Sequence, residues 1–323
     1  MSPVIPSYRE LRAATPPGSS WSVWGPDFSL GSLNHLSCGR ALAAAQTVRT
    51  GQTYSLNLAF DEIDPPLFGR SSGVHRLTNG YDAPFHDDLI DGFNTQSSSQ
   101  WDGLRHARHP VYGWYGGVPE EQHGVQHWAA RTITGRGVLV DIDRWQRARG
   151  SDYTPGESYP ITTADIDAAL RAQAVTLEPG DILCVRTGWL RWYRDLDPAQ
   201  RSVVHGSVRA VGLAPGHETL AWLWDNQLAA VAADNPAVEA YPFGSTLPAD
   251  LVAELQADPT RADELNLHQA AIPLLGLVLG ELFDLDALAA DCARDDRWVF
   301  LFTAAPMGLP GGAGSPANAV AMR

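Results

Sequence analysis

The sequence predicts an α/β protein that forms one large domain with a β-sheet core and flanking helices. Short apolar runs, which indicate buried strands, alternate with helical segments along the second half of the chain. The 323 residues are enough to bury a core, and 44% hydrophobic with 19% charged residues is typical of an ordered globular protein. Because no internal repeat or clean boundary divides the chain, we expect an N-terminal arm at residues 1–20 and a single domain at residues 21–323.

The first half of the chain predicts few regular elements. Residues 38–49 are rich in alanine and indicate a helix that stops before Gly51, and residues 53–59 alternate as a strand does. Residues 61–92 are rich in Pro, Gly and Asp, which predicts a long irregular loop. Long loops inside compact domains are often functional, so we expect this one to pass near a pocket and His86 to contact the substrate.

The second half predicts the core of the sheet. Strands are predicted at residues 135–142, 182–187, 228–233 and 298–304, and helices at residues 163–174 and 216–226. The run at 298–304 is expected to be the last strand. Residues 308–318, rich in Gly and Pro, predict a final loop that covers the site or a neighbouring subunit.

Charge and cysteine content exclude several classes of function. The formal net charge of −14 at pH 7 argues against nucleic acid or an anionic membrane as a partner, because both bind basic surfaces. The three cysteines, Cys38, Cys184 and Cys292, lie far apart and outside any CxxC pair, so we expect reduced thiols. No apolar segment predicts a signal peptide or a membrane span, and a cytoplasmic protein is expected.

A polar stretch at residues 94–109 carries the candidate chemistry. Gln96, Gln100, Asp102 and His106 recur there at spacings of four, two and four residues. In an extended chain the side chains of Gln96, Gln100 and Asp102 project to one face, because side chains alternate with period two. Two carboxamides and a carboxylate are costly to bury without a purpose. The stretch therefore predicts a site for a hard or borderline cation, with His106 as a proton carrier.

This stretch resembles the signature H-x-G-T-H-x-D-x-P-x-H of the metal-dependent cyclase family that includes kynurenine formamidase and isatin hydrolase. Gln96 and Gln100 stand at the first two histidines of that pattern. Asp102 stands at its aspartate and His106 at its last histidine. The form S-Q-W-D-G-L-R-H resembles the longer branch of the family.

The resemblance extends over most of the chain. Four further pieces match the family in order and spacing, at residues 24–36, 135–141, 180–189 and 268–282. The resemblance implies a swivelling β/β/α-type fold with a mixed β-sheet core. It also implies a homo-oligomer, either a dimer or a tetramer.

A cation site is implied as well. His268 and Glu281 resemble the downstream ligands of the family, and Gln96, Gln100 and Asp102 complete the implied set. Glu281 is also a lone charge in the apolar run G-L-V-L-G-E-L and needs a partner there. The implied cation is Mn²⁺ or Zn²⁺, and two carboxamides in place of imidazoles shift the site towards Mn²⁺, Mg²⁺ or Ca²⁺. The alternative is that no metal binds and the glutamines hydrogen-bond the substrate.

The activity that the resemblance implies is a metal-dependent hydrolase that opens a C–N or C–O bond in a small cyclic or aromatic amide, formamide or lactone. His106 would act as general base and then as general acid, and Glu281 as a ligand or second base. Aromatic and basic side chains are the expected substrate contacts, namely Trp101, His86, Tyr115 and Arg186.

Two other functions stay open. A metal-free cyclase or dehydratase of a natural-product pathway would use His106 and the glutamines without a cation, and a binding protein would have lost the chemistry. Metal content separates the hydrolase from both. No G-x-S-x-G nucleophile elbow, nucleophilic-cysteine signature or dinucleotide-binding loop competes with these interpretations.

Overall fold

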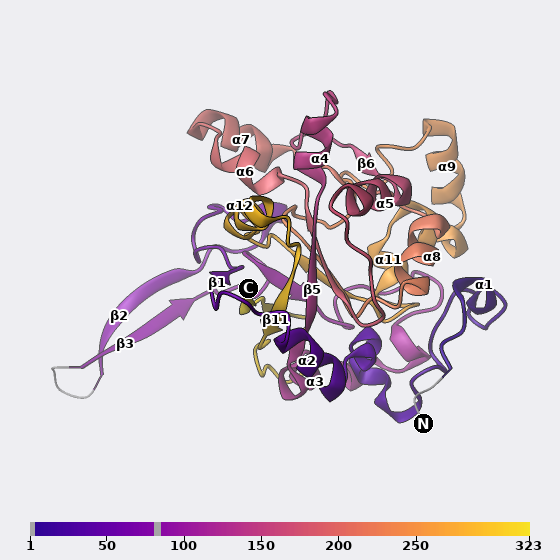
Figure 1. Ribbon diagram of the computed structural model, residues 1–323. Coiled ribbons are helices and arrows are strands. Elements are labelled where there is room, and N and C mark those ends of the chain that lie inside the picture. Colours follow the sequence, from indigo (N-terminus) through magenta and orange to yellow (C-terminus); the bar gives the residue numbers. More distant parts are fainter. Residues whose placement is uncertain (1–3, 81–84) are drawn as a thin grey trace.

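A curled nine-stranded β-sheet forms the centre of the molecule (Figure 1). The structure is a computed structural model that describes residues 4–80 and 85–323. The strand order is β1-β13-β11-β5-β7-β9-β10-β4-β12. In chain order these strands are β1 (Thr53–Ser55), β4 (Gln100–Asp102), β5 (Ile133–Asp141), β7 (Ile182–Arg186), β9 (Ala230–Ala233), β10 (Val278–Glu281), β11 (Val299–Ala304), β12 (Gly314–Pro316) and β13 (Ala319–Met322). The predicted α/β class with a mixed sheet is confirmed.

Four parallel strands make up the middle of the sheet. β5 pairs with β7, β7 with β9 and β9 with β10 in parallel, while the pairings that involve the other five strands are antiparallel. β7, β9 and β10 are buried along their whole length, as expected of strands covered on both faces. The carboxyl ends of the four parallel strands meet at one edge of the sheet, which is where open α/β proteins bind ligands.

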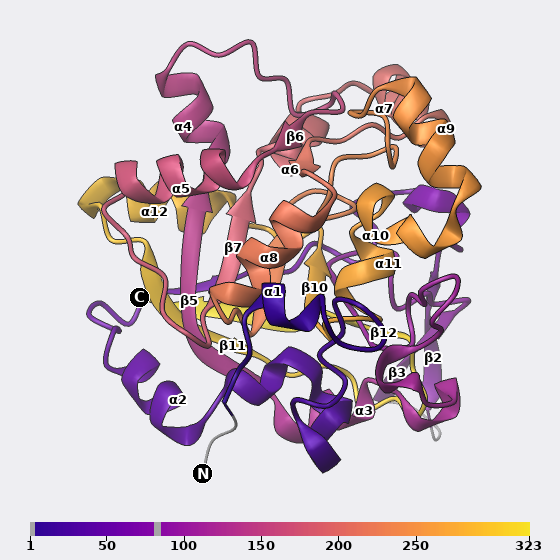
Figure 2. The same cartoon turned by 90° about the vertical axis from the view of Figure 1, so that its right-hand side faces the viewer.

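Helices cover both faces of this sheet. α5 (Thr163–Ala172) and α8 (His217–Asp225) lie in front of β5 and β7 in Figure 2, and α12 (Asp286–Asp295) lies behind β5. α5 begins at a capping box, in which the Thr162 hydroxyl accepts from the Asp165 N–H and the Asp165 carboxylate accepts from Thr162. The remaining helices are α1 (Tyr8–Leu11), α2 (Cys38–Ala45), α3 (Gln126–Arg131), α4 (Ile142–Ala148), α6 (Trp189–Arg194), α7 (Pro198–Gly206), α9 (Ala249–Ala257), α10 (Ala262–Leu265) and α11 (His268–Ala271).

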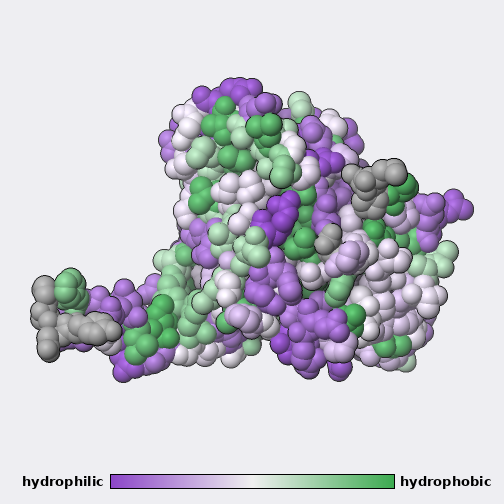
Figure 3. All heavy atoms as spheres, turned by 90° about the horizontal axis from the view of Figure 1, so that it is seen from below, coloured by the Kyte–Doolittle hydropathy of each residue, from purple (hydrophilic) through white to green (hydrophobic). Residues whose placement is uncertain are grey.

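The predicted loop at residues 61–92 contains two strands, so that part of the loop prediction is wrong. β2 (Val74–Gly80) and β3 (Phe85–Asp91) form an antiparallel hairpin that projects from the body of the molecule (Figure 3). All of β3 is exposed and both faces of the hairpin mix polar with apolar residues, so the sequence lacks the alternation of a half-buried strand. An ion pair between Arg76 and Asp91 joins the two strands instead.

The C-terminal tail adds two strands that the sequence did not predict. β12 lies within residues 308–318, where a final loop was expected, and β13 follows it, although residues 298–304 were expected to be the last strand, so both predictions are wrong here. Both strands are short and owe their place to their partners: β12 pairs with β4, and β13 lies between β1 and β11. A strand of three or four residues carries too little periodicity to be recognised in the sequence alone. For the same reason β1 ends at Ser55, earlier than predicted.

The N-terminal arm is tied to the body by hydrogen bonds. The Tyr8 N–H donates to Asp225 Oδ1 at 2.7 Å, and the Ser20 N–H donates to the Leu274 carbonyl at 2.9 Å. The division between arm and domain stays a prediction. Within residues 4–80 and 85–323, no helix is long and apolar enough to cross a membrane.

Candidate active site

The register between β4 and β10 gathers three polar side chains on one face of the sheet. Glu281 lies opposite Gln100, and Leu279 lies opposite Asp102. Directly opposed residues of an antiparallel pair point to the same side, as do residues two apart on one strand. Glu281 ends the parallel strand β10, so the three polar side chains lie at the edge of the sheet formed by the carboxyl ends.

Asp102, Glu281 and His268 meet at this edge. His268 Nε2 lies 3.2 Å from Glu281 Oε1 and 3.6 Å from Asp102 Oδ2. All three side chains are buried, Asp102 completely. Asp102 Oδ2 has no hydrogen-bond partner among the described residues. A buried carboxylate oxygen without a partner is costly unless something else binds it.

Burial and mutual contact shift the proton affinities of these three side chains. Burial and the Asp102 carboxylate raise the pKa of Glu281 to about 7. Burial alone would raise the pKa of Asp102, but the positive charges that His106 and His268 carry at the low pH where Asp102 titrates outweigh burial and hold this pKa below its usual value. Burial lowers the pKa of His268, but the nearby carboxylates of Asp102, Glu239 and Glu281 outweigh burial and raise this pKa well above its usual value. His268 therefore holds a proton that a bound cation would displace.

A further buried carboxylate, Glu239, fixes His268 from behind. Glu239 Oε1 lies 2.7 Å from His268 Nδ1 and accepts from the His268 N–H at 2.9 Å. Its other oxygen accepts from the Leu267 N–H at 2.7 Å. Because Nδ1 donates to Glu239, Nε2 is the atom that faces Asp102 and Glu281. A carboxylate behind an imidazole orients the ring and raises its basicity, as it does behind many metal-binding histidines.

Gln96 and Gln100 turn their amide nitrogens towards the carboxylates. Gln100 Nε2 donates to Glu281 Oε2 at 2.6 Å and to Asp102 Oδ1 at 3.3 Å. Gln96 Nε2 donates to Asp102 Oδ1 at 2.9 Å. Gln100 Oε1 accepts from Arg70 Nη1 at 3.1 Å. A cation binds a carboxamide through its oxygen, so neither glutamine is oriented as the ligand that the resemblance implied.

His106 lies beside these side chains. Its Nδ1 is 2.7 Å from Gln96 Nε2, and its Nε2 is 3.7 Å from Asp102 Oδ1. The Asp102 carboxylate raises the pKa of His106, but burial and the charges of His268 and Arg70 outweigh it, so this pKa lies below its usual value. His106 is therefore neutral at pH 7.

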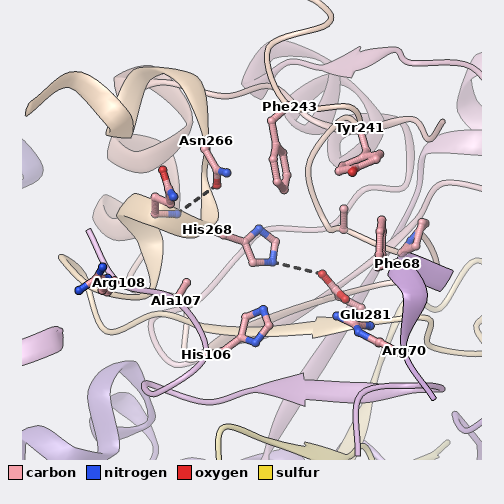
Figure 4. Close-up of a pocket in the computed structure, with 13 residues that line it drawn as sticks. Phe68, Arg70, His106, Ala107, Arg108, Tyr241, Phe243, Asn266, His268 and Glu281 are labelled. Carbon is pink, nitrogen blue, oxygen red and sulfur yellow. Dashed lines mark hydrogen bonds and ion pairs between the residues drawn. The ribbon is translucent and has the colours of Figure 1, made fainter. Parts of the chain in front are cut away.

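A cavity of about 370 Å³ opens onto His268 and Glu281 (Figure 4). Phe68, Tyr241 and Phe243 form an aromatic wall in which the Tyr241 ring lies 5.2 Å from Phe68 and 5.0 Å from Phe243, centroid to centroid. The Phe243 ring lies 6.2 Å from that of His268. An apolar wall with a few convergent polar groups is typical of a small-molecule site.

Trp101 and Tyr115 do not line this cavity, although both were expected to contact the substrate. Trp101 alternates to the opposite face of β4 from the polar residues, where its ring packs 4.9 Å from that of Phe283. Tyr115 is fully buried, and its hydroxyl lies 3.1 Å from Ser20 Oγ. Both rings belong to the packed interior of the fold, which is why they do not reach the cavity.

His86 and Arg186 are also placed elsewhere. His86 is exposed on β3 of the projecting hairpin. Arg186 ends β7 and is buried among Asp141, Asp143 and Asp286, at distances of 2.8, 3.1 and 2.8 Å. A guanidinium bound by three carboxylates is fully engaged and does not turn into the cavity.

Sequence reasoning missed most of the residues that shape the cavity. Phe68 and Arg70 lie in the long loop that was expected near the pocket, but composition does not show which loop side chains turn inward. Tyr241 and Phe243 follow β9 and gave no signal. Glu239 follows β9 at the carboxyl-end edge of the sheet, and that position is the signal that points to it.

Asp102, His268 and Glu281 fit a divalent cation. Each offers one ligand atom, and these atoms lie within 4.8 Å of one another. Two carboxylates and an imidazole suit Mn²⁺, and Zn²⁺ accepts the same donor types. Asp102 Oδ2, unpartnered within the described part of the chain, is available as a ligand atom.

A second group of this kind, His217, Asp263 and Glu264, is already neutralised. Arg12 pairs with Asp263 at 3.2 Å, and Arg261 pairs with Glu264 at 2.6 Å. Because each carboxylate has a guanidinium partner, this group is a salt-bridge network that ties the N-terminal arm to the body.

Comparison with known proteins gives the family. The family model described as "Putative cyclase" matches residues 53–240, more than half of the chain. A crystal structure of a novel cyclase is 33% identical, with 94% of this chain and 99% of that chain covered and a TM-score of 0.79. Among curated proteins no match is found.

Two isatin hydrolases share the fold at lower identity. Isatin hydrolase A from Labrenzia aggregata, solved with benzyl benzoate, is 18% identical, with 90% of this chain and 98% of that chain covered and a TM-score of 0.57. Isatin hydrolase A from Ralstonia solanacearum is 14% identical, with coverage of 88% and 97% and a TM-score of 0.55. From the family match and the 33% identical cyclase, this chain belongs to the putative cyclase family.

Proposed function

We propose that the protein is a metal-dependent hydrolase that opens a C–N or C–O bond in a small cyclic or aromatic amide, formamide or lactone. The observation that carries the proposal is the buried group of Asp102, His268 and Glu281 beside an aromatic cavity. Membership of the cyclase family and the fold shared with isatin hydrolases support it.

The three buried side chains would hold the cation, which is Mn²⁺ or Zn²⁺. The two carboxylates favour Mn²⁺, because carboxylate oxygens are ligands that this ion prefers. When bound, the cation would polarise the carbonyl that is attacked and lower the pKa of a water molecule. Glu239 contributes by keeping His268 Nε2 turned towards Asp102 and Glu281.

Proton transfer is assigned to Glu281, with His106 beside it as a hydrogen-bonding group. Without a cation, burial and Asp102 raise the pKa of Glu281 to about 7, so this carboxylate has an unusually high affinity for a proton. The oxygen of water bonds to the carbonyl carbon as its proton moves away. The C–N or C–O bond then breaks, and the departing atom keeps the electron pair and takes up the proton.

The aromatic wall supports a planar substrate. The Tyr241 ring contacts the rings of Phe68 and Phe243 edge to face, so the three rings line one side of the cavity (Figure 4). A volume of about 370 Å³ is near the lower end for ligand pockets, which favours a compact molecule.

Hydrolysis assays test the proposal directly. Aromatic cyclic amides, formamides and lactones are supplied to the protein with Mn²⁺, with Zn²⁺ or with a chelator. We expect turnover of at least one class with a cation, none with the chelator, and none by a folded Glu281→Gln variant. A protein that binds either cation but hydrolyses no member of the three classes would contradict the proposal.

A metal-free cyclase or dehydratase is the second candidate. Arg70 favours it, because its guanidinium binds the carbonyl oxygens of Gln96 and Gln100 and brings a positive charge beside the carboxylates. Full activity after chelator treatment, together with elemental analysis that finds no metal, would select this candidate.

The expected homo-oligomer and cytoplasmic location stay predictions. A dimer or tetramer is expected from the resemblance alone, and static light scattering of the purified protein measures it. A monomer would contradict that prediction and leave the proposed chemistry untouched.

A further inference from the structure

We propose that Gln96 is a positioning residue that sets the tautomer of His106. Its amide NH₂ group bonds Asp102 and His106 at once and so keeps the His106 proton on Nε2. The hydrogen bonds alone determine which ring nitrogen of His106 is protonated. The role of this tautomer in catalysis rests on the proposed function.

The contact with Asp102 fixes the orientation of the Gln96 amide. Gln96 Nε2 lies 2.9 Å from Asp102 Oδ1. An ionised carboxylate only accepts hydrogen bonds, so the NH₂ group and not the carbonyl oxygen must face it. Turning the amide over would set two oxygens against each other next to a buried charge, which is costly.

The backbone of Gln96 is held at both of its polar groups. Its N–H donates to Asn94 Oδ1 at 2.9 Å, and its carbonyl oxygen accepts from Arg70 Nη1. The same Arg70 atom also donates to Gln100 Oε1, so one guanidinium steadies both glutamines. The surrounding hydrogen bonds therefore fix the orientation of the Gln96 side-chain amide.

The second hydrogen of this NH₂ group determines where His106 keeps its proton. Gln96 Nε2 and His106 Nδ1 are 2.7 Å apart. An amide NH₂ group only donates, so His106 Nδ1 must accept. A neutral imidazole whose Nδ1 accepts carries its proton on Nε2.

This tautomer divides the work between His106 and Glu281. With its Nδ1 lone pair engaged and a proton on Nε2, His106 does not act as the base. It donates a hydrogen bond from Nε2 to the substrate atom that gains negative charge, and it keeps its proton. Glu281 takes the proton from water and returns it to the departing nitrogen or oxygen. His106 lies beside the group of Asp102, His268 and Glu281 and is not one of its three members.

Histidine tautomers are measured by NMR of the whole protein labelled with ¹⁵N-histidine, at pH 8 without added metal or substrate. The signals of His106 are those lost in His106→Asn. We expect a bare Nδ1 and a protonated Nε2. Gln96→Glu replaces the donor by an acceptor and should bring a proton onto Nδ1. Gln126→Glu is the matched control, because Gln126 Nε2 lies 3.1 Å from His127 Nε2 outside the cavity, and it should leave the His106 signals unchanged.

A second variant keeps the test valid if Gln96→Glu does not fold. Gln96→Met has a similar length and no donor, so both tautomers of His106 should be populated. The inference would be overturned if His106 of the wild type carried its proton on Nδ1. It would also be overturned if His106 stayed entirely in the Nε2–H form in the folded Gln96 variants. The spectra need neither substrate nor cation, so failure of the proposed hydrolysis leaves them unaffected. Active enzyme with the other tautomer would refute only the role of Gln96.

Discussion

Two buried charge clusters lie along the same edge of the sheet, and they differ in how their charges are paired. The Arg186 cluster consists of Arg186, Asp141, Asp143 and Asp286, and the Asp102 cluster of Asp102, His268 and Glu281. In the first, one guanidinium bonds all three carboxylates at 2.8–3.1 Å. In the second, one imidazole serves two carboxylates, and an Asp102 oxygen finds no partner in the described residues.

Pairing, and not cavity size, separates a structural cluster from a functional one. The cavity beside the Arg186 cluster is about 720 Å³, larger than the roughly 370 Å³ cavity beside the Asp102 cluster. The buried charges at the larger cavity are already satisfied within the protein, so nothing there calls for a ligand. The smaller cavity has an unsatisfied carboxylate and an aromatic wall, which is the combination that binding and catalysis require.

The largest expected effect is on stability, from the Arg186 cluster. Arg186→Met removes the cation that three carboxylates share and leaves the buried Asp141 without an ion-pair partner among the described residues, so the free energy of unfolding should fall by about 3–5 kcal/mol. Urea denaturation at pH 7 measures it. Arg147→Met is the control, because Arg147 pairs with Asp143 from an exposed position and should cost less than about 1 kcal/mol. Similar small losses in both variants would mean that the pairing at Arg186 does not hold the fold.

The second-largest expected effect is on catalytic activity, and it concerns His106, which lies beside the Asp102 cluster. His106→Ala should lower kcat by about 10²-fold or more, because it removes a positioned hydrogen-bond donor from the cavity. Its side chain is 27% exposed, so the free energy of unfolding should change by less than about 1 kcal/mol. His127→Ala, which changes a histidine outside the cavity, should leave kcat unaltered. Retained kcat in His106→Ala would remove His106 from the mechanism.

A smaller effect concerns cation affinity. Glu239→Gln weakens the support behind His268, so the affinity for Mn²⁺ should fall by about 10–100-fold. Titration calorimetry with MnCl₂ measures the change. Glu264→Gln alters a carboxylate of the salt-bridge network near the arm and should leave the affinity unchanged. Equal affinities in the wild type and Glu239→Gln would show that this carboxylate only supports the fold.

The smallest expected effect is the pH dependence of cation binding. Burial and Asp102 raise the pKa of Glu281 to about 7, so protons compete with the cation below this pH. Lowering the pH from 8 to 6 should therefore weaken Mn²⁺ binding by at least about tenfold, and the affinity should recover as the pH rises. An affinity that is flat over this range would show that no ligand changes its protonation on binding.

The sequence predicted the parts of the molecule that local pattern controls. Each of β5, β7 and β11 contains a short apolar run, and Thr162 caps α5 by a recognisable motif. The hairpin of β2 and β3 was not predicted, because polar and apolar residues do not alternate along its exposed strands.

Sequence alone predicted only those site residues that belong to a short recognisable motif. Asp102 and His106 stand out in the polar stretch, and the family resemblance supplied His268 and Glu281. Arg70 comes from the stem of the hairpin, and its use depends on a long-range contact with Gln100 that no spacing reveals. The direction in which a glutamine amide points is set by its neighbours in space, so a pattern of residue types could suggest the glutamines as ligands but not test that role.

A titration of Mn²⁺ into metal-free wild-type protein and into Asp102→Asn tests the central claim most directly. Thermal stability is the readout, since a ligand that binds the folded state raises the melting temperature. We predict that Mn²⁺ raises the melting temperature of the wild type and leaves that of Asp102→Asn unchanged. If Mn²⁺ and Zn²⁺ stabilise neither protein, or stabilise both equally, the unpaired oxygen of Asp102 is not a cation ligand.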